Sequence, residues 1–428
     1  MVEKKSGQLN EGYERSVCLK GRSMRNSRLI QFPMILFALL FLGIAPPFVG
    51  AFFTVGSYAP GIILSVSLIF VFLFGFLPKL LSVELGAVVF VFLLMFWSLA
   101  QILVSGGLNE RAIFSLLPFI VLVITAKLVS LYLVRVDERV VRSLVVTLVA
   151  IGGVLAVANF LSGFELGRAL GYPYNKSIFP FGEPSHFALF FGAFWLAFCL
   201  IVDRANYFLW GGVYFLMAIL LPSVSLLIYM VILMAVSLRF TLTRVLGFSF
   251  TIACIVLWAL NSSYLLSRVN FSGGVNLSGL VYLQGAIDAY NCVCRTFGLG
   301  LGFQMLGTQP PSDISLEIAR ILEADEATNR FDGGFLAAKL VAEFGVLGIL
   351  LIALYLRCAV RSLVWLRGVR YRGVGKLKEL LCHCIVLGFS VELFVRGIGY
   401  FSAGVFLFFV AIFYLARNGT QKHLDSLV

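Results

Sequence analysis

Hydrophobic positions in this chain form long continuous runs, and they do not alternate with polar positions. A helix needs about 20 apolar residues to cross a bilayer. In lipid every backbone polar group must be satisfied internally, and continuous runs favour helices over barrel strands. We therefore predict an all-α polytopic membrane protein with about twelve spans. Their approximate ranges are 30–52, 59–77, 83–104, 112–134, 140–162, 185–202, 206–221, 223–239, 243–260, 333–356, 378–396 and 398–416.

Composition agrees with this class. The chain is 60% hydrophobic and 13% charged, against about 25% charged residues in soluble domains. The runs predict one transmembrane domain, 29–417, between a basic tail, 1–28, and a short tail, 418–428. Two external loops, 163–184 and 261–332, interrupt it. Loops of such length are usually functional or carry structure of their own.

The positive charges orient the spans. Placing the N-terminus inside assigns about 23 of the 33 lysines and arginines to cytoplasmic segments and eight to the external side. This asymmetry predicts that both termini are cytoplasmic. The net charge of +12 then reflects topology and contact with anionic lipid head groups, so we expect no nucleic-acid partner.

Helical spacing recurs inside the larger loop. Apolar positions from Leu280 to Tyr290 follow a helical period, and a second stripe runs from Ile314 to Leu322. Ser312 and Asp313 are suitable caps for the second helix. We expect two amphipathic helices on the outer face of the membrane.

Charged residues at or inside spans carry a functional interpretation by default, but structural pairs are an alternative. Lys339 and Glu343 are four residues apart, and so are Glu392 and Arg396. Residues at this spacing face each other on a helix. We favour a structural pair for Lys339 and Glu343, and keep pairing as the alternative for Glu392 and Arg396.

The stretch FGEPSHFALFFG, Phe181–Gly192, places polar groups directly before an apolar run. Pro184 suits the first position of a helix. Glu183 would then lie at the helix N-terminus, where the helix dipole favours a carboxylate or a phosphate. Ser185 and His186 would project from the first turn. The alternative is that Glu183 only favours the helix start and His186 only packs at the interface.

Four segments in the second half of the chain carry a resemblance. They are FGEPSHFALFFG, RTFGLGLGF (Arg295–Phe303), RFDGGFLAAKLVAEFGVLGILL (Arg330–Leu351) and LFVRGIGYFS (Leu393–Ser402). In this order, and with a long external loop, they resemble Wzy-type O-antigen and exopolysaccharide polymerases. The first 160 residues are similar only as generic spans.

The resemblance implies a GT-C-like glycosyltransferase in the bacterial inner membrane. It would act at the periplasmic face on oligosaccharide repeat units linked to undecaprenyl pyrophosphate. The growing chain would pass to the non-reducing end of a new unit. No cofactor or metal is implied. Membrane lipids are further partners, and a polysaccharide chain-length regulator is a candidate protein partner.

Candidate site residues follow from this chemistry. Arginines suit a multi-oxygen pyrophosphate, and a sugar hydroxyl needs a base within hydrogen-bond reach. Glu183 is the first candidate for the base and Asp332 the second, while His186 would orient the acceptor or bind phosphate. The remaining candidates are Arg295, Arg330 and Arg396 for pyrophosphate, and Tyr172, Tyr174, Asn175 and Tyr400 for sugar.

Two other functions compete. O-antigen ligases carry a histidine near the end of the large loop, where this chain reads NRFDGG, Asn329–Gly334. A flippase or transporter for lipid-linked oligosaccharide should show internal repeats and deep cationic residues. Here Lys127 is one deep lysine, and we find no repeat. The polymerase is therefore the favoured interpretation.

Overall fold

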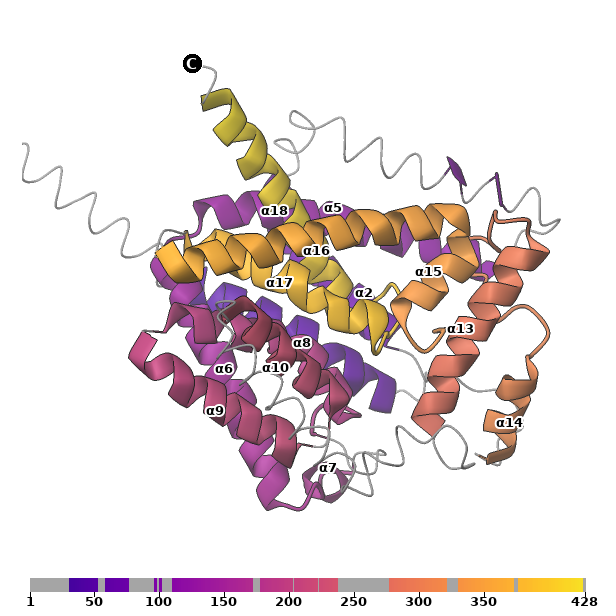
Figure 1. Cartoon of the computed structure of the whole chain (residues 1–428), viewed down its shortest axis with the longest axis horizontal. Helices are drawn as coiled ribbons and strands as arrows, with labels where there is room; N and C mark the ends of the chain where they lie inside the picture. Colours follow the sequence, from indigo (N-terminus) through magenta and orange to yellow (C-terminus); the bar gives the residue numbers. More distant parts are fainter. Residues whose placement is uncertain are drawn as a thin grey trace, which may run out of the picture.

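A computed structural model gives the fold (Figure 1). It describes residues 31–52, 58–76, 96–97, 100–101, 110–171, 178–202, 204–221, 223–237, 277–321, 330–372 and 376–425. Over these ranges the chain is helical, apart from turns, connecting segments and an isolated bridge between Ile178 and Phe181. The predicted span 243–260, most of the span 83–104, and Tyr172, Tyr174 and Asn175 lie outside the described residues.

Several helices have the length and apolarity of membrane spans. In the described part of the chain these are Gln31–Phe52, α5 (Glu110–Arg135), α6 (Glu138–Leu161), α8 (Pro184–Ile201) and the segment Val346–Arg370 of α16 (Val346–Arg372). Shorter apolar helical stretches are α2 (Ala59–Leu73), Leu209–Leu220 of α9 (Arg204–Leu220), α10 (Val224–Ser237) and Ala403–Asn418 of α18 (Ala403–Asp425). The all-α class is confirmed for the described chain, and its apolar helices suit membrane insertion. The number of twelve spans stays a prediction.

The predicted span 333–356 is wrong as a single helix. The chain forms α15 (Leu336–Phe344), breaks at Gly345 and continues as α16, which extends well beyond residue 356. Gly345 has φ +57°, and a Cβ there would lie 1.9 Å from the carbonyl oxygen of Gly298. Val346 N–H donates to that same carbonyl at 2.8 Å. The break therefore attaches the glycine-rich segment after α13 to the start of α16.

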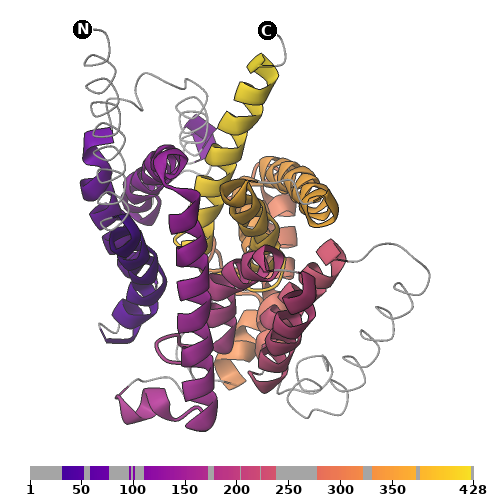
Figure 2. The same cartoon turned by 90° about the vertical axis from the view of Figure 1, so that its left-hand side faces the viewer.

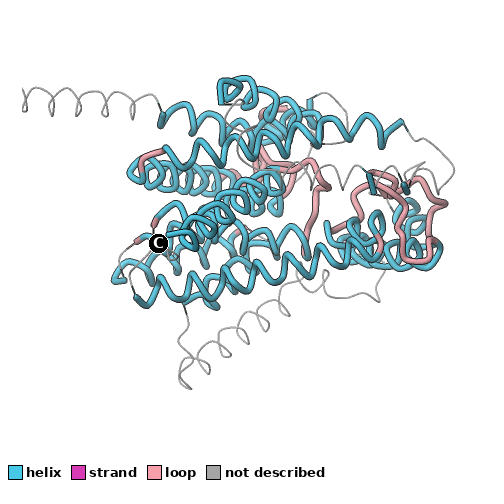
Figure 3. Tube along the Cα trace, turned by 90° about the horizontal axis from the view of Figure 1, so that it is seen from above, coloured by secondary structure: helices cyan, strands magenta, loops and turns pink. Residues whose placement is uncertain are grey.

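Both helices predicted within the loop 261–332 are present. They are α13 (Leu277–Arg295) and α14 (Asp313–Ile321). The α14 start is as expected, since Leu316 N–H donates to the Ser312 carbonyl at 3.0 Å. Figure 1 shows α13, α14 and α15 together at one end of the molecule. Seen from above, many of the non-helical segments lie at this end (Figure 3).

Helix α17 (Leu377–Phe394) is the centre of the bundle. It packs against α8, α16 and α18, while α18 also packs against α5, and α8 against α6 and α10. Figure 2 shows the indigo helices of residues 31–76 on the side of the bundle opposite to α9. Because α8 and α17 are neighbours, the polar ends of both helices meet, and the candidate site lies there.

Candidate functional site

The start of α8 is held in place by neighbouring elements. Asn159 of α6 receives the Phe179 N–H on its Oδ1 at 2.9 Å and donates from Nδ2 to the Phe179 carbonyl at 3.2 Å. Glu183 is the N-cap residue, with extended backbone (φ −143°, ψ 152°), and Pro184 opens the helix. The predicted helix start is therefore confirmed. Phe181 and Phe187 are buried on either side of it, so the turn that carries Glu183 is anchored in the core.

Glu183 and Arg396 lie together although they are 213 residues apart in the chain. The Arg396 guanidinium donates to Glu183 Oε1 at 3.0 Å and to Oε2 at 3.1 Å, and Ser185 Oγ donates to Oε2 at 2.9 Å. The Glu183 side chain is 49% exposed and that of Arg396 24%. Such an accessible pair contributes at most about 1 kcal/mol to stability. Two predicted site residues thus form a solvent-reachable charged pair.

His186 contacts an aromatic residue from the first part of the chain. Its Nδ1 lies 2.9 Å from the Tyr58 hydroxyl, and the two rings meet edge to face with centroids 5.0 Å apart. Tyr58 precedes α2 directly. The sequence offered no signal for Tyr58, because nothing local connects it to α8.

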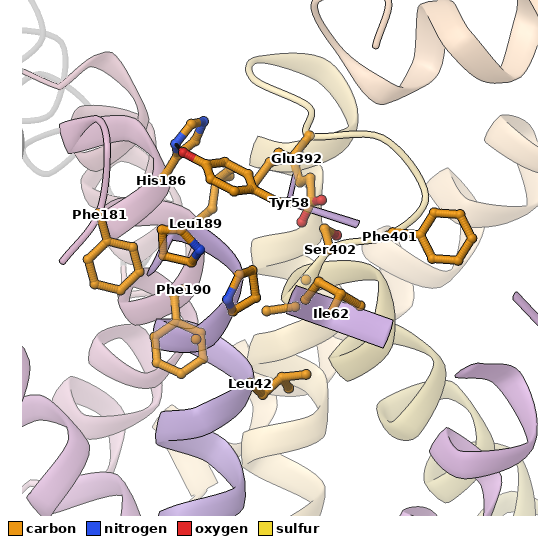
Figure 4. Close-up of a pocket in the computed structure, with 16 residues that line it drawn as sticks. Leu42, Tyr58, Ile62, Phe181, His186, Leu189, Phe190, Glu392, Phe401 and Ser402 are labelled. Carbon is orange, nitrogen blue, oxygen red and sulfur yellow. Dashed lines mark hydrogen bonds between the residues drawn. The ribbon is translucent and has the colours of Figure 1, made fainter. Parts of the chain in front are cut away.

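A pocket opens beside these residues (Figure 4). It is small, with a cavity volume of about 30 Å³, which is room for one or two water molecules. Its walls are mainly apolar, with Leu42, Ile62, Phe190 and Phe401 among them. Its polar side chains are Tyr58, His186, Glu392 and Ser402. Figure 4 shows the Tyr58 ring extending from His186 toward Glu392.

Glu392 does not form the pair with Arg396 that the helical spacing allowed, since Arg396 pairs with Glu183. Glu392 is 2% exposed, and its Oε1 has no hydrogen-bond partner among the described residues. A Cβ at position 404 would lie 1.7 Å from Glu392 Oε2, so Gly404 makes room for the carboxylate. No local sequence pattern indicates this pocket, because its walls come from helices far apart in the chain.

A second polar cluster lies under the glycine-rich segment. Lys339 Nζ is 3.7 Å from Glu343 Oε1, and both side chains are buried. Glu343 also accepts the backbone N–H groups of Gln304 and Leu306 at 3.0 and 3.1 Å. The structural pair favoured from the sequence is therefore confirmed. It fixes the loop after α13 onto α15.

Tyr400 belongs to this second cluster. It is 5% exposed, its ring stacks on Phe303 with centroids 5.3 Å apart, and Lys339 Nζ lies 5.2 Å from the ring centre. This is a packed position next to a charge. Its predicted contact with sugar stays a prediction.

The other predicted charged residues lie around α13 and the turn before α15. Arg330 donates to the Gln309 carbonyl, and Arg295 is the last residue of α13. Burial raises the pKa of Asp288 on α13, while a hydrogen bond with Ser312 and the charges of Arg330 and Arg295 counteract this rise. Arg330 and Arg295 therefore both lie near the Asp288 carboxylate. Arg396 instead pairs with Glu183.

Asp332 connects these two regions. A Cβ at Gly399 would lie 3.2 Å from Asp332 Oδ1, so this carboxylate lies against the turn that follows Arg396. The Gly397 N–H donates to the Gly334 carbonyl at 3.1 Å. The backbone beside Asp332 is thus hydrogen-bonded to the backbone beside Arg396.

The cluster Cys382, His383 and Cys384 has packing contacts. The His383 ring stacks on Trp365 with centroids 4.2 Å apart, and its Nδ1 lies 3.0 Å from Ser362 Oγ. Both cysteines are buried. These contacts give His383 a packing role between α16 and α17.

Replacing Lys339 by methionine should destabilise the protein strongly. Removing one partner of a buried ion pair typically costs about 3–5 kcal/mol, because the other charge stays buried and unpaired. The double variant Lys339→Met with Glu343→Gln should lose less than the sum of the two single variants. Thermal unfolding in detergent measures this.

Arg320→Met is the matched control for Lys339→Met. Arg320 forms an exposed pair with Glu317 at 2.7 Å, and such exposed pairs contribute little to stability. Equal melting temperatures for Lys339→Met and Arg320→Met would contradict the structural role of the buried pair.

Comparisons of this chain with protein families, curated proteins and solved structures find no match. The resemblance to the polymerases therefore stays a prediction that rests on the four segments. Function has to be argued from the arrangement of the site.

Proposed function

We propose that this protein is a glycan polymerase of the inner membrane. It transfers a growing polysaccharide from undecaprenyl pyrophosphate to the non-reducing end of a lipid-linked repeat unit at the periplasmic face. The observation that carries the proposal is the contact of Glu183 with Arg396. It brings a carboxylate and a guanidinium from two of the polymerase-like segments to one helix N-terminus, beside a pocket.

Arg396 and the α8 N-terminus supply positive charge for the leaving group. A guanidinium donates two parallel hydrogen bonds to phosphate oxygens as readily as to a carboxylate. Backbone N–H groups at a helix N-terminus also favour anions. Because the Arg396 side chain is 24% exposed, a pyrophosphate can reach it. Arg295 and Arg330 would contact the more distant phosphate or sugar groups from α13 and its neighbouring turn.

Glu183 takes the role of base in this scheme. The acceptor hydroxyl gives its proton to the Glu183 carboxylate, and its oxygen bonds to the anomeric carbon of the growing chain. The bond between that carbon and the phosphate oxygen breaks, and its electron pair leaves with the pyrophosphate. The free energy resides in the pyrophosphate linkage, so no nucleotide enters the step. When the pyrophosphate recruits Arg396, Glu183 is released from its ion pair and becomes a better proton acceptor.

Purified protein with lipid-linked repeat units tests the function. A polymerase should convert them into a ladder of lengths that differ by one repeat unit. A ligase should instead make a single transfer to a lipid A core acceptor, and a flippase should move the units across a vesicle membrane without elongation. A preparation that only transfers once, or only translocates, would contradict the polymerase.

The proposed topology has its own test. Cysteine at position 310, an exposed site before α14, should react with a membrane-impermeant maleimide added outside. Cysteine at position 368 of α16, where a Cβ meets open space, should react only after permeabilisation. Both substitutions belong in a background without the eight native cysteines. Labelling from outside at 368 and not at 310 would reverse the proposed orientation.

A further inference from the structure

Helix α13 and the turn after it carry an exposed apolar stripe, formed by Leu283, Ala286, Tyr290, Cys294 and Phe297. The first four follow a spacing of three or four residues, which places them on one face of the helix. Leu283, Tyr290 and Phe297 are 39%, 70% and 97% exposed. None of the five is charged, whereas a helix face that meets water usually carries charged or polar residues. This face therefore suits an apolar partner.

The opposite face of α13 is covered by protein. Ala289 and Cys292 are buried, and α13 packs against α15 and α14. Gly285 lies so close to the turn before α15 that a Cβ there would be 1.9 Å from the Gly333 carbonyl oxygen. Helix α13 is thus fixed on the protein by one face, and the stripe points away from it.

The position of Phe297 identifies the apolar partner as lipid. Gly298 accepts the Val346 N–H at 2.8 Å, so Phe297 lies beside the first turn of α16. At this turn α16 begins an exposed apolar face, which includes Val346, Ile349 and Leu350. Because α16 has the length and apolarity of a membrane span, Phe297 continues a surface that suits the bilayer.

The apolar face of α16 is too short to cross the hydrocarbon alone. Arg357 and Arg361 are exposed on α16, eleven and fifteen residues after Val346, which is about 16 and 22 Å along the helix. Arginine is costly at the bilayer centre, so the apolar face ends near these residues. The hydrocarbon core is about 30 Å thick, which leaves about 8–14 Å of it beyond Val346. Phe297 and the end of α13 lie at this end of α16.

The direction of α13 agrees with this depth. Figure 1 shows α13 running across the direction of α16 at the end of the bundle. A helix that lies in the plane of the membrane, with its apolar face in the acyl region, has this orientation relative to a spanning helix.

We propose that the stripe of α13 lies in the outer leaflet of the bilayer, with the Phe297 ring among the acyl chains. Helix α14 stays in water, because Asp313 and Arg320 are exposed on it and Arg320 pairs with Glu317. The sequence predicted both helices on the membrane, and the proposal assigns this place to α13 alone. It does not depend on the proposed polymerase function.

Spin labelling in a bilayer tests the proposal. The full chain without its eight native cysteines would carry a nitroxide on Phe297→Cys or Tyr290→Cys, in vesicles of phosphatidylethanolamine and phosphatidylglycerol. Collision rates are measured with oxygen, which concentrates in the acyl region, and with a nickel chelate, which stays in water. The logarithm of their ratio should be positive at both positions.

Two positions of similar exposure are the matched controls. Leu354 on α16 is 48% exposed and Leu316 on α14 is 53% exposed. A label on Leu354→Cys should give a positive value, and a label on Leu316→Cys a negative one. A value at 297 and 290 equal to that at 316 overturns the proposal. Low collision rates with both reagents also overturn it, because a second copy of the chain would then cover the stripe.

A charge at position 297 should move the stripe toward water, since a charged side chain is costly in the acyl region. With the label at position 290, Phe297→Asp should lower the ratio of oxygen to nickel collisions. Leu316→Asp should leave this ratio unchanged. An unchanged ratio in folded Phe297→Asp would contradict the insertion of Phe297. If Phe297→Cys does not fold, the label at 290 alone decides the place of the stripe.

Discussion

Arg396→Lys should lose about 100-fold or more of the polymerisation rate although it keeps the positive charge. One Arg396 nitrogen, Nη2, donates to both oxygens of Glu183, at 3.0 and 3.1 Å, and a guanidinium can offer a pyrophosphate two nitrogens at once. Lysine is a point charge on a flexible chain and cannot offer the planar fork of two nitrogens. Loss of a group that stabilises developing charge typically costs about 10²–10³-fold in kcat. The initial rate of ladder formation measures the effect.

Stability should change little in the same variant. The pair of Arg396 with Glu183 is partly exposed, and exposed pairs contribute about 0–1 kcal/mol. A folded, inactive Arg396→Lys is therefore the expected result. Arg320→Lys is the matched control, because Arg320 is also paired with a glutamate but lies on the exposed surface of α14. Normal polymer from both Arg396→Ala and Arg330→Ala would remove the arginines from the mechanism.

Local signals in the sequence were sufficient where the structure depends on nearby residues. Pro184 after Glu183 marks the α8 start, and the apolar stripes in the large loop mark α13 and α14. The spacing of Lys339 and Glu343 was enough to expect their pair. In each case the residues that decide the conformation are within a few positions of one another.

The break at Gly345 illustrates what the hydrophobic pattern cannot give. The run 333–356 is continuously apolar, and a single span satisfies it. The chain breaks because Gly345 takes φ +57° against the Gly298 carbonyl, a contact between segments 47 positions apart. A glycine allows this conformation, but a glycine is also common inside membrane helices.

Long-range contacts also determine which residues meet at the candidate site. Spacing on one helix suggested Glu392 as the partner of Arg396, but Arg396 follows the end of α17, where the chain leaves helical geometry. Its side chain meets Glu183 of α8. Tyr58 and part of the pocket wall come from the first two described helices and the turn between them. The packing of α17 against α8 created these contacts, and no local pattern reports it.

Glu183→Gln should lower polymerisation by about 10²–10⁴-fold, the usual contribution of a general base. Glutamine keeps the size of the side chain and one acceptor oxygen for Arg396, but it loses the charge and the ability to take a proton. The protein should still fold, because Glu183 makes no side-chain hydrogen bond to the N–H groups of α8. The ladder of polymer lengths and its initial rate are the measurements.

The alternative for Glu183 predicts a very different result. If it only favours the helix start, its charge contributes about 0.3–1 kcal/mol, and Glu183→Gln would keep nearly full activity with a slightly lower melting temperature. Glu165→Gln is the matched control, because Glu165 is an exposed glutamate of the same loop that pairs with Arg168 at 3.6 Å. A wild-type ladder from Glu183→Gln would reject Glu183 as base and transfer the role to Asp332.

Loss of activity alone does not separate proton transfer from positioning, so the pH dependence decides between them. If Glu183 takes the proton, the wild-type rate should fall on the acidic side as a carboxylate becomes protonated, since only the ionised form can act as base. The residual activity of Glu183→Gln should lack this acidic limb. The alternative is that Glu183 only positions Arg396 through the contacts at 3.0 and 3.1 Å. The fall in rate at acidic pH then comes from another group. Glu183→Gln should therefore be slower but should show the same fall at acidic pH.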